Sequence, residues 1–302
     1  MKNEVARALE QGVTKRRTLL RSLSRGQQQK LLEDLFIDFF ANQHTTLQKW
    51  AALTGQSAQV DTGYIAQFVA SIVLKEPGQG FRGKGDDLAD GSEVKSAANI
   101  SGVDRPRWNH NLGKPSDDAK RAAKGELPVW QEYLNAPAFF YLLVDRVVGK
   151  ELPRPIRVRA WALDAQKDQA WRQLVKTFVQ QRISDRYNLQ LHPPVGYDDS
   201  IVVNTLGNLD LANVLVFDAR IVAQPGGRHA VRWEKPLPDE VLPVTGRSRA
   251  VPYGGRTARP SRLTDAADLV ADIAVIPNLF PGVFDEKEES ILEEVSREEA
   301  EA

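Results

Sequence analysis

The stretch GKGDDLADGSEVKSA, residues 83 to 97, organises the rest of the chain. Its Asp-Gly pair is typical of a tight hairpin turn, in which the central positions need positive φ. After the turn, Glu93-Val94-Lys95 alternates polar, apolar and polar, as a half-buried strand does. We therefore expect Glu93 and Lys95 on one face of a strand and Val94 on the other.

A short strand before the turn, residues 84 to 88, would bring Asp86 or Asp87 back beside Glu93. Which aspartate faces Glu93 depends on the length of the turn, because strand side chains alternate between faces. Two carboxylates and the ammonium of Lys95 would then meet at one end of a hairpin. Such a site can hold a hard divalent cation and activate a water.

Composition excludes several classes of protein. The chain has 302 residues, enough for one large domain or two modest ones, and no cysteine, so disulfides and cysteine-zinc sites are excluded. Its four histidines have no close ligand spacing, so a histidine zinc site is not expected. No apolar run approaches membrane-spanning length and no signal-peptide core is present, so we expect a cytoplasmic protein without a membrane partner.

Charge is unevenly distributed along this formally neutral chain. Residues 285 to 302 contain nine acidic and two basic residues, a net charge of −7, so residues 1 to 284 carry +7. A mildly basic body fits an anionic partner, and the acidic end is expected to be a solvated tail. A basic cluster between residues 15 and 25 is expected to be a solvated helix face rather than a DNA-binding arm.

The first part of the chain is predicted to be helical. Apolar residues recur with helical spacing from 27 to 42, and a shorter helix is expected from 45 to 53, ending near Gly55. Asp61 or Thr62 is expected to cap a third helix, which runs to about residue 75 and stops before a Glu-Pro-Gly sequence.

Strands dominate the part that follows the acidic stretch. Residues 138 to 148 form a dense apolar run, typical of a strand buried on both faces, and residues 155 to 163 a second strand with regular alternation. We expect a helix from Asp164 to about Arg182, short strands and turns from 184 to 225, and a last helix from 264 to 276. The order of elements predicts an α/β fold, with an N-terminal helical region (1–58), a main domain (59–284) and the tail (285–302).

Two arginine-bearing segments are candidates for contact with a polyanion. Residues 96 to 115 are predicted to be a polar loop, and residues 245 to 264 contain five arginines and no acidic residue. Arginine matches phosphates and guanine edges, so both segments favour DNA contact, with ordinary surface loops as the alternative. The candidate DNA-binding residues are Arg105, Arg107, Asn109, Arg247, Arg249, Arg256 and Arg259.

The residues Asp87…Glu93-Val94-Lys95 resemble the PD-(D/E)xK signature of type II restriction endonucleases and mismatch-repair nicking enzymes. The wider run from 83 to 96 is similar to that of MamI-type restriction endonucleases, bacterial enzymes that cut interrupted palindromes. The superfamily resemblance covers chiefly residues 60 to 165 and implies a mixed central sheet flanked by helices. Two features depart from the pattern: Asp86 replaces the proline, and the interval to Glu93 is short.

The resemblance implies a Mg²⁺-dependent mechanism. Asp87, or Asp86 as the alternative first ligand, and Glu93 would bind Mg²⁺ together with the carbonyl oxygen of Val94. Lys95 would orient or deprotonate the attacking water and stabilise the pentacovalent state. The helix before the site often supplies a supporting polar residue in this superfamily, and Gln67 is the candidate here.

The implied function is that of a type II site-specific deoxyribonuclease in the bacterial cytoplasm. It would make double-strand cuts in DNA by phosphodiester hydrolysis, in a restriction-modification pair with a cognate DNA methyltransferase. A palindromic target would require a twofold homodimer. Two alternatives are a repair or nicking nuclease of the same fold, and a non-enzymatic DNA-binding protein in which the acidic hairpin is a surface turn.

Overall fold

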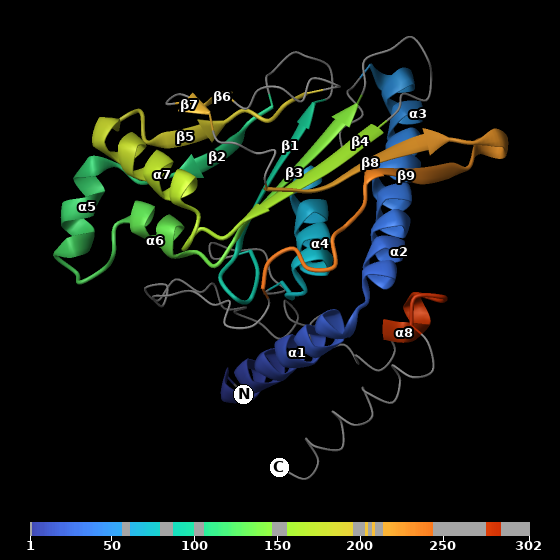
Figure 1. Ribbon diagram of the computed structural model, residues 1–302, viewed down its shortest axis with the longest axis horizontal. Coiled ribbons are helices and arrows are strands. Elements are labelled where there is room, and N and C mark those ends of the chain that lie inside the picture. The colour runs from blue at the N-terminus through green and yellow to red at the C-terminus, as the bar shows by residue number, and fades with distance from the viewer. Residues whose placement is uncertain are drawn as a thin grey trace.

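The protein is an α/β structure in which helices flank a five-stranded mixed sheet, with a helical region at the N-terminus (Figure 1). This architecture confirms the predicted restriction-endonuclease-like fold class. The computed structural model describes residues 2–55, 61–78, 87–99, 106–146, 156–195, 203–204, 207–208, 214–243 and 276–284. The arginine-rich segment predicted for DNA contact, the acidic tail and nearly all of the last predicted helix lie outside the described residues.

The main sheet has the strand order β1-β3-β4-β8-β9. Its strands are β1 (Glu93–Asn99), β3 (Phe139–Arg146), β4 (Ile156–Leu163), β8 (Leu215–Ala223) and β9 (His229–Lys235). Only the first pair is parallel, and it sets Glu93 opposite Phe139; the other three pairs are antiparallel. β1 is therefore an edge strand beside the long buried strand β3.

The N-terminal helices are α1 (Lys2–Ser22), α2 (Arg25–Leu35), α3 (His44–Thr54) and α4 (Thr62–Leu74). A π-helix, η1 (Phe36–Gln43), joins α2 to α3 in one continuous rod beside the sheet (Figure 1). Ser24 begins the rod with a capping box, and Gly55 ends it at a φ of 71°. Asp61 caps α4 as predicted, because its carboxylate accepts from the N–H of Gly63.

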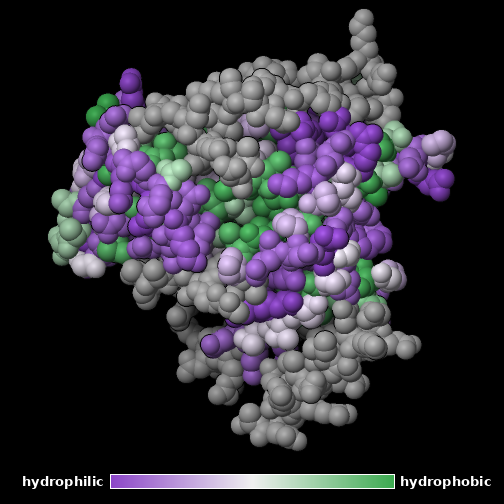
Figure 2. Space-filling model, viewed as in Figure 1, coloured by the Kyte–Doolittle hydropathy of each residue, from purple (hydrophilic) through white to green (hydrophobic). Residues whose placement is uncertain are grey.

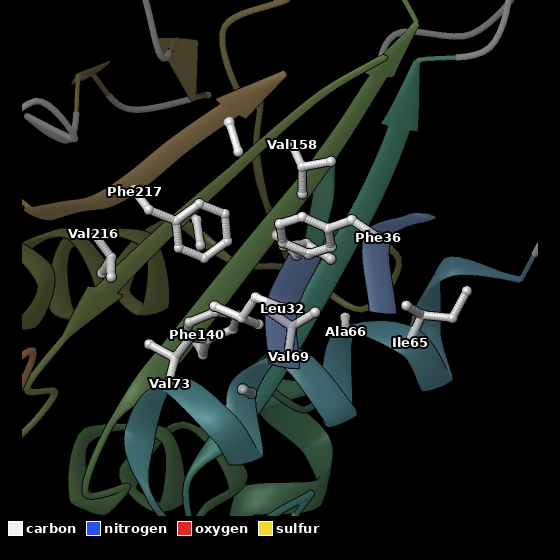
Figure 3. Close-up of a cluster of buried hydrophobic side chains, with 14 of the residues drawn as sticks. Leu32, Phe36, Ile65, Ala66, Val69, Val73, Phe140, Val158, Val216 and Phe217 are labelled. Carbon is white, nitrogen blue, oxygen red and sulfur yellow. The ribbon is translucent and has the colours of Figure 1, made fainter. Parts of the chain in front are cut away.

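The first hydrophobic core lies between these helices and one face of the main sheet (Figure 3). Leu32 and Phe36 come from the helical rod, Val69 from α4, and Phe140 and Val158 from the central strands. Each of these side chains is fully buried, and such burial stabilises by about 1.5–3 kcal/mol per large apolar side chain. The division of the chain at residue 58 stays a prediction.

The opposite face of the sheet is covered by a second layer. It contains a small sheet of order β2-β5-β6-β7, made of β2 (Trp108–Asn111), β5 (Asn188–Leu191), β6 (Val203–Asn204) and β7 (Gly207–Asn208). Its helices are α5 (Pro115–Ala122), α6 (Val129–Asn135) and α7 (Gln169–Gln181). An aromatic-rich second core joins this layer to the sheet through Trp108, Tyr141 and Trp171.

Two short elements complete the described chain: η3 (Pro225–Gly227) at the β8–β9 turn, and α8 (Ile276–Leu279). On the face shown in Figure 2, hydrophobic residues gather near the middle and hydrophilic residues lie on both sides. None of the helices in the described ranges combines the length and the apolar character needed to cross a membrane.

Several predicted elements differ from the structure. The segment from 96 to 115 is not one polar loop, because β1 continues to Asn99 and residues 108 to 111 form β2. The helix expected from Asp164 begins at Gln169, since Asp168 caps it. One long strand, β8, replaces part of the short strands expected between 184 and 225.

The basic face of α1 is also not simply solvated. The guanidinium of Arg17 donates from Nε to both carboxylate oxygens of the fully buried Glu76, at 2.9 and 3.0 Å. Arg21 pairs with the same carboxylate at 3.4 Å. The basic residues are spaced as on an exposed helix, and their acidic partner lies more than fifty positions along the chain, so the sequence alone does not reveal the pairing.

The buried pair Arg157–Asp218 gives a first test of the fold. Both side chains are nearly inaccessible, and Nε of Arg157 donates to Oδ1 of Asp218 at 2.9 Å. We expect Asp218→Ala to lower the free energy of unfolding by about 3–5 kcal/mol in urea titrations, because Arg157 loses its carboxylate inside the protein.

The matched control replaces both charges. The double variant Arg157→Met/Asp218→Leu should recover most of the lost stability, because no buried charge is left alone. A double variant as unstable as Asp218→Ala would show that packing, and not charge compensation, determines the cost.

Candidate active site

The acidic stretch forms a three-residue turn that leads into β1. The N–H of Leu88 donates to the carbonyl of Ser92 at 3.1 Å, and Gly91 donates back to Leu88 at 3.0 Å. Gly91 has a φ of 93°, whereas Asp90 keeps an ordinary negative φ and accepts from the N–H of Ser92 through its side chain. The expectation that both central positions need positive φ is therefore wrong; this is a turn in which only the last residue is left-handed.

The backbone of Pro77 and Gly78 supports this turn. Leu88 forms an isolated antiparallel bridge with Gly78, and the N–H of Ala89 donates to Pro77 at 2.9 Å. Residues 84 to 86 of the expected strand lie outside the described part. Asp87 lies in a bend, and Leu88 forms only the single bridge, so the described end of this segment is not a strand. Glu76, held by α1, immediately precedes this supporting segment.

Asp87 is fixed by two donors. Its Oδ2 accepts from the backbone N–H of Val94 at 2.7 Å, and its Oδ1 accepts from the side-chain amide of Gln67 at 2.7 Å. Burial, and then the charge of Glu93, raise the pKa of Asp87 to about 6, although the Val94 N–H and Lys95 act in the opposite direction. Of the two aspartates weighed as first ligand, Asp87 lies beside Glu93; Asp86 lies outside the described residues.

Glu93 and Lys95 share one face of β1, as the alternation predicts. Nζ of Lys95 lies 3.1 Å from Oε2 of Glu93, and the two side chains are 21% and 18% exposed. Burial alone would lower the pKa of Lys95, but the carboxylate of Glu93, followed by Tyr133 and Asp87, outweighs it, so the pKa is raised. The lysine is therefore protonated at neutral pH in this site.

An aromatic group behind Lys95 was not predicted from the sequence. His110, on β2, is fully buried, and its Nε2 is hydrogen-bonded to the hydroxyl of Tyr141 at 2.9 Å. Burial and then the charge of Lys95 lower the pKa of His110 to about 3, so this histidine stays neutral. The signal was present as the apolar-polar alternation Trp108-Asn109-His110-Asn111, which places His110 inside.

The donor set fits a hard divalent cation. Asp87 and Glu93 place carboxylate oxygens together, and both the burial of Asp87 and its repulsion by Glu93, which raise the pKa of Asp87, are costs that a bound cation would offset. No third His, Cys, Asp or Glu joins them in the described part of the chain. Further ligands would be a backbone carbonyl such as that of Val94, water and substrate oxygens, as is usual for Mg²⁺.

The predicted DNA-contacting residues are only partly described. Arg107 and Asn109 are exposed, the first just before β2 and the second on its outer face. Arg105, Arg247, Arg249, Arg256 and Arg259 lie outside the described residues.

An edge strand with a carboxylate and a lysine on one face, and a second carboxylate from the preceding turn, defines a protein of the restriction-endonuclease-like class.

Comparison with known proteins identifies the family. The family model for MamI restriction endonuclease matches residues 49–221. The chain is 62% identical over 302 residues to the type II restriction enzyme MamI of Microbacterium ammoniaphilum, covering all of this chain and 98% of that protein. No solved structure matches. The chain belongs to the MamI restriction endonuclease family, which confirms the resemblance seen in the sequence.

The raised pKa of Asp87, caused by burial and then by the charge of Glu93, gives a pH-dependent test. A pKa raised from 3.8 to about 6 means that the folded, metal-free protein binds a proton at Asp87 more tightly than the unfolded chain does. This contribution to stability is present below about pH 4 and is lost as the pH rises through about 6. We expect Asp87→Asn in EDTA to be more stable than the wild type by on the order of 1–2 kcal/mol at pH 7.5, and equally stable near pH 4.

Thermal unfolding at several pH values measures this difference. Asp38→Asn, which removes an exposed carboxylate from η1, is the matched control for the loss of one negative charge. A constant difference between Asp87→Asn and wild type across this range would contradict the raised pKa of Asp87.

Proposed function

We propose that this chain is a Mg²⁺-dependent type II restriction endonuclease that hydrolyses phosphodiester bonds in both strands of DNA at a specific site. Membership of the MamI restriction endonuclease family supports the class of activity. The single observation that carries the proposed chemistry is the convergence of Asp87, Glu93 and Lys95 on one end of β1.

Asp87 and Glu93 would hold the metal, with the Val94 carbonyl as a further oxygen ligand. When bound, Mg²⁺ would lower the pKa of a water and offset charge on the scissile phosphate. The residues that prepare this site are the donors to Asp87. Gln67 and the N–H of Val94 fix the orientation of that carboxylate before any ligand arrives, which limits the reorganisation needed for binding.

Lys95 would act as a hydrogen-bond donor and a positive charge. Its raised pKa keeps the ammonium protonated, so it can orient the attacking water and stabilise the negative charge that develops on the phosphate oxygens. The alternative role of Lys95 is to deprotonate the water. In that role the ammonium would first have to lose its own proton. The salt bridge to Glu93 disfavours that loss.

The partners and location complete the proposal. Double-stranded DNA would be contacted by Arg107 and Asn109 on the exposed side of β2, and by the arginine-rich segment between residues 245 and 264. Two subunits related by a twofold axis would each cut one strand of a palindromic site. A cognate methyltransferase would protect the host DNA in the bacterial cytoplasm.

Removal of Glu93 or Lys95 tests the catalytic assignment. We expect Glu93→Gln and Lys95→Met each to reduce cleavage by roughly 10³-fold or more, because each removes a group that acts on the reacting phosphate, and to leave DNA binding largely intact. Cleavage of plasmid and phage DNA with Mg²⁺ or EDTA, followed by end mapping, gives the readout. Lys124→Met, at an exposed position after α5, is the matched control and should cut normally.

The same assay separates the alternatives. Discrete fragments with defined ends support restriction cleavage, whereas nicks or structure-dependent cuts support a repair or nicking enzyme. Full cleavage by either variant would contradict the catalytic role of Glu93 or Lys95. Absence of any Mg²⁺-dependent cleavage by the wild type would favour a non-enzymatic DNA-binding protein.

Gln67 tests the supporting role. Gln67→Ala removes one of the two donors to Asp87, so the carboxylate is held less firmly. We expect the Mg²⁺ concentration for half-maximal cleavage to rise about 10–100-fold, with a smaller effect at saturating Mg²⁺. Ser71→Ala, on the same helix, serves as the control. An unchanged Mg²⁺ dependence in Gln67→Ala would show that the amide does not position the ligand.

A further inference from the structure

A small cavity lies at the end of the sheet opposite to the candidate active site. It is lined by η1, α3, β3, β4, β8 and β9. Its volume of about 20 Å³ has room for one water-sized group. Arg146, the last residue of β3, lines it. Glu93 is paired with the first residue of the same strand, so the cavity lies about 23 Å from the catalytic end at 3.3 Å per residue.

Arg146 brings a buried positive charge into this cavity. The residue is 5% exposed, and no described residue is hydrogen-bonded to its Nε or Nη1. No acidic residue is among the described residues that line the cavity. Burial lowers the pKa of Arg146 to about 10, which still leaves the guanidinium charged at neutral pH. A buried charge without a counter-charge costs several kcal/mol, so this arrangement favours binding of an anion.

Two histidines add hydrogen-bonding groups to the same lining. Nδ1 of the buried His44 and Nδ1 of the half-buried His229 also lack partners within the part of the chain that the structure describes. Burial and then the charge of Arg146 lower the pKa of His44 to about 4, so its ring is neutral at pH 7 and can present an N–H. Arg146 therefore supplies the charge, and the histidines supply further donors.

We propose that this cavity is a second binding site, specific for an oxyanion of the phosphate class. One oxygen would enter the cavity between Arg146, His44 and His229, and the rest of the anion would lie at the mouth, beside Thr45 and Gln48. A water could satisfy one of the donors but could not balance the guanidinium charge. The same chemistry is offered by free inorganic phosphate and by the DNA backbone.

Thermal unfolding of the full-length protein in EDTA tests the site without any need for cleavage. In sodium phosphate, compared with sodium chloride of equal ionic strength, we expect the Tm of the wild type to rise by about 2 °C or more. Arg146→Met should abolish this rise and should itself fold, because it removes a buried charge while keeping an apolar side chain of similar length. Lys49→Met, at an exposed position on α3 outside the cavity lining, should keep the rise.

Binding of a labelled DNA duplex in EDTA separates the two sources of phosphate. If the DNA backbone is the ligand, Arg146→Met should weaken binding and reduce the slope of log affinity against log salt by about one. If free phosphate is the ligand, only the Tm rise is lost.

His229→Ala is the second variant, and it should reduce the response that Arg146→Met abolishes. The proposal is overturned if Arg146→Met matches the wild type in both experiments, or if phosphate gives the wild type no advantage over chloride and the variants bind DNA as the wild type does. Loss of cleavage by the catalytic variants has no bearing on either result.

Discussion

The parallel pairing of β1 with β3 is the constraint on which the candidate site depends. Its register places Glu93 opposite Phe139 and Lys95 opposite Tyr141, so both polar side chains lie on the face of the second core. Val94, between them, enters the first core. A slip of one residue would exchange these faces and bury both charges among the helices. Because β3 is buried along its whole length, apolar packing at a distance from the site makes that slip unfavourable.

The same pairing creates a local conflict. With Glu93 fixed on the strand and Asp87 fixed by the turn, two carboxylates stand close together, and burial followed by the charge of Glu93 raises the pKa of Asp87. Gln67, the Val94 N–H and Lys95 offset part of the repulsion. The packing of the surrounding structure, including the fully buried Leu88, holds the two carboxylates in place against the remaining repulsion. Two close carboxylates are an arrangement that stability alone would not favour, and a site that holds a cation would account for it.

The sequence predicts those parts of the structure that have a local signal. Helical spacing located α2 and α4, the dense apolar run located β3, and alternation put Glu93 and Lys95 on one face. The segment that supports the turn, Gly78 against Leu88, could not be predicted because its pairing depends on how distant segments meet. Arg157 and Arg159 alternate with apolar residues as on a half-exposed strand, yet both are buried, since β8 and β3 supply their acidic partners. The alternation that places His110 inside is present in the sequence, but β2 has only four residues, so the signal is weak.

Buried charges in the described ranges of the chain divide into two groups. Those of Arg157 and Glu76 are matched by partners from the chain itself, so folding alone compensates them. At the two ends of β3 the charges are not matched in this way. The carboxylates beside its first residue repel each other, and the guanidinium at its last residue has N–H groups for which the described residues supply no partner. Because a folded protein retains an uncompensated buried charge only against a considerable cost, the sign of each imbalance indicates the sign of its ligand. A cation at one end of the strand and an anion at the other would each remove a destabilising interaction that the fold leaves in place.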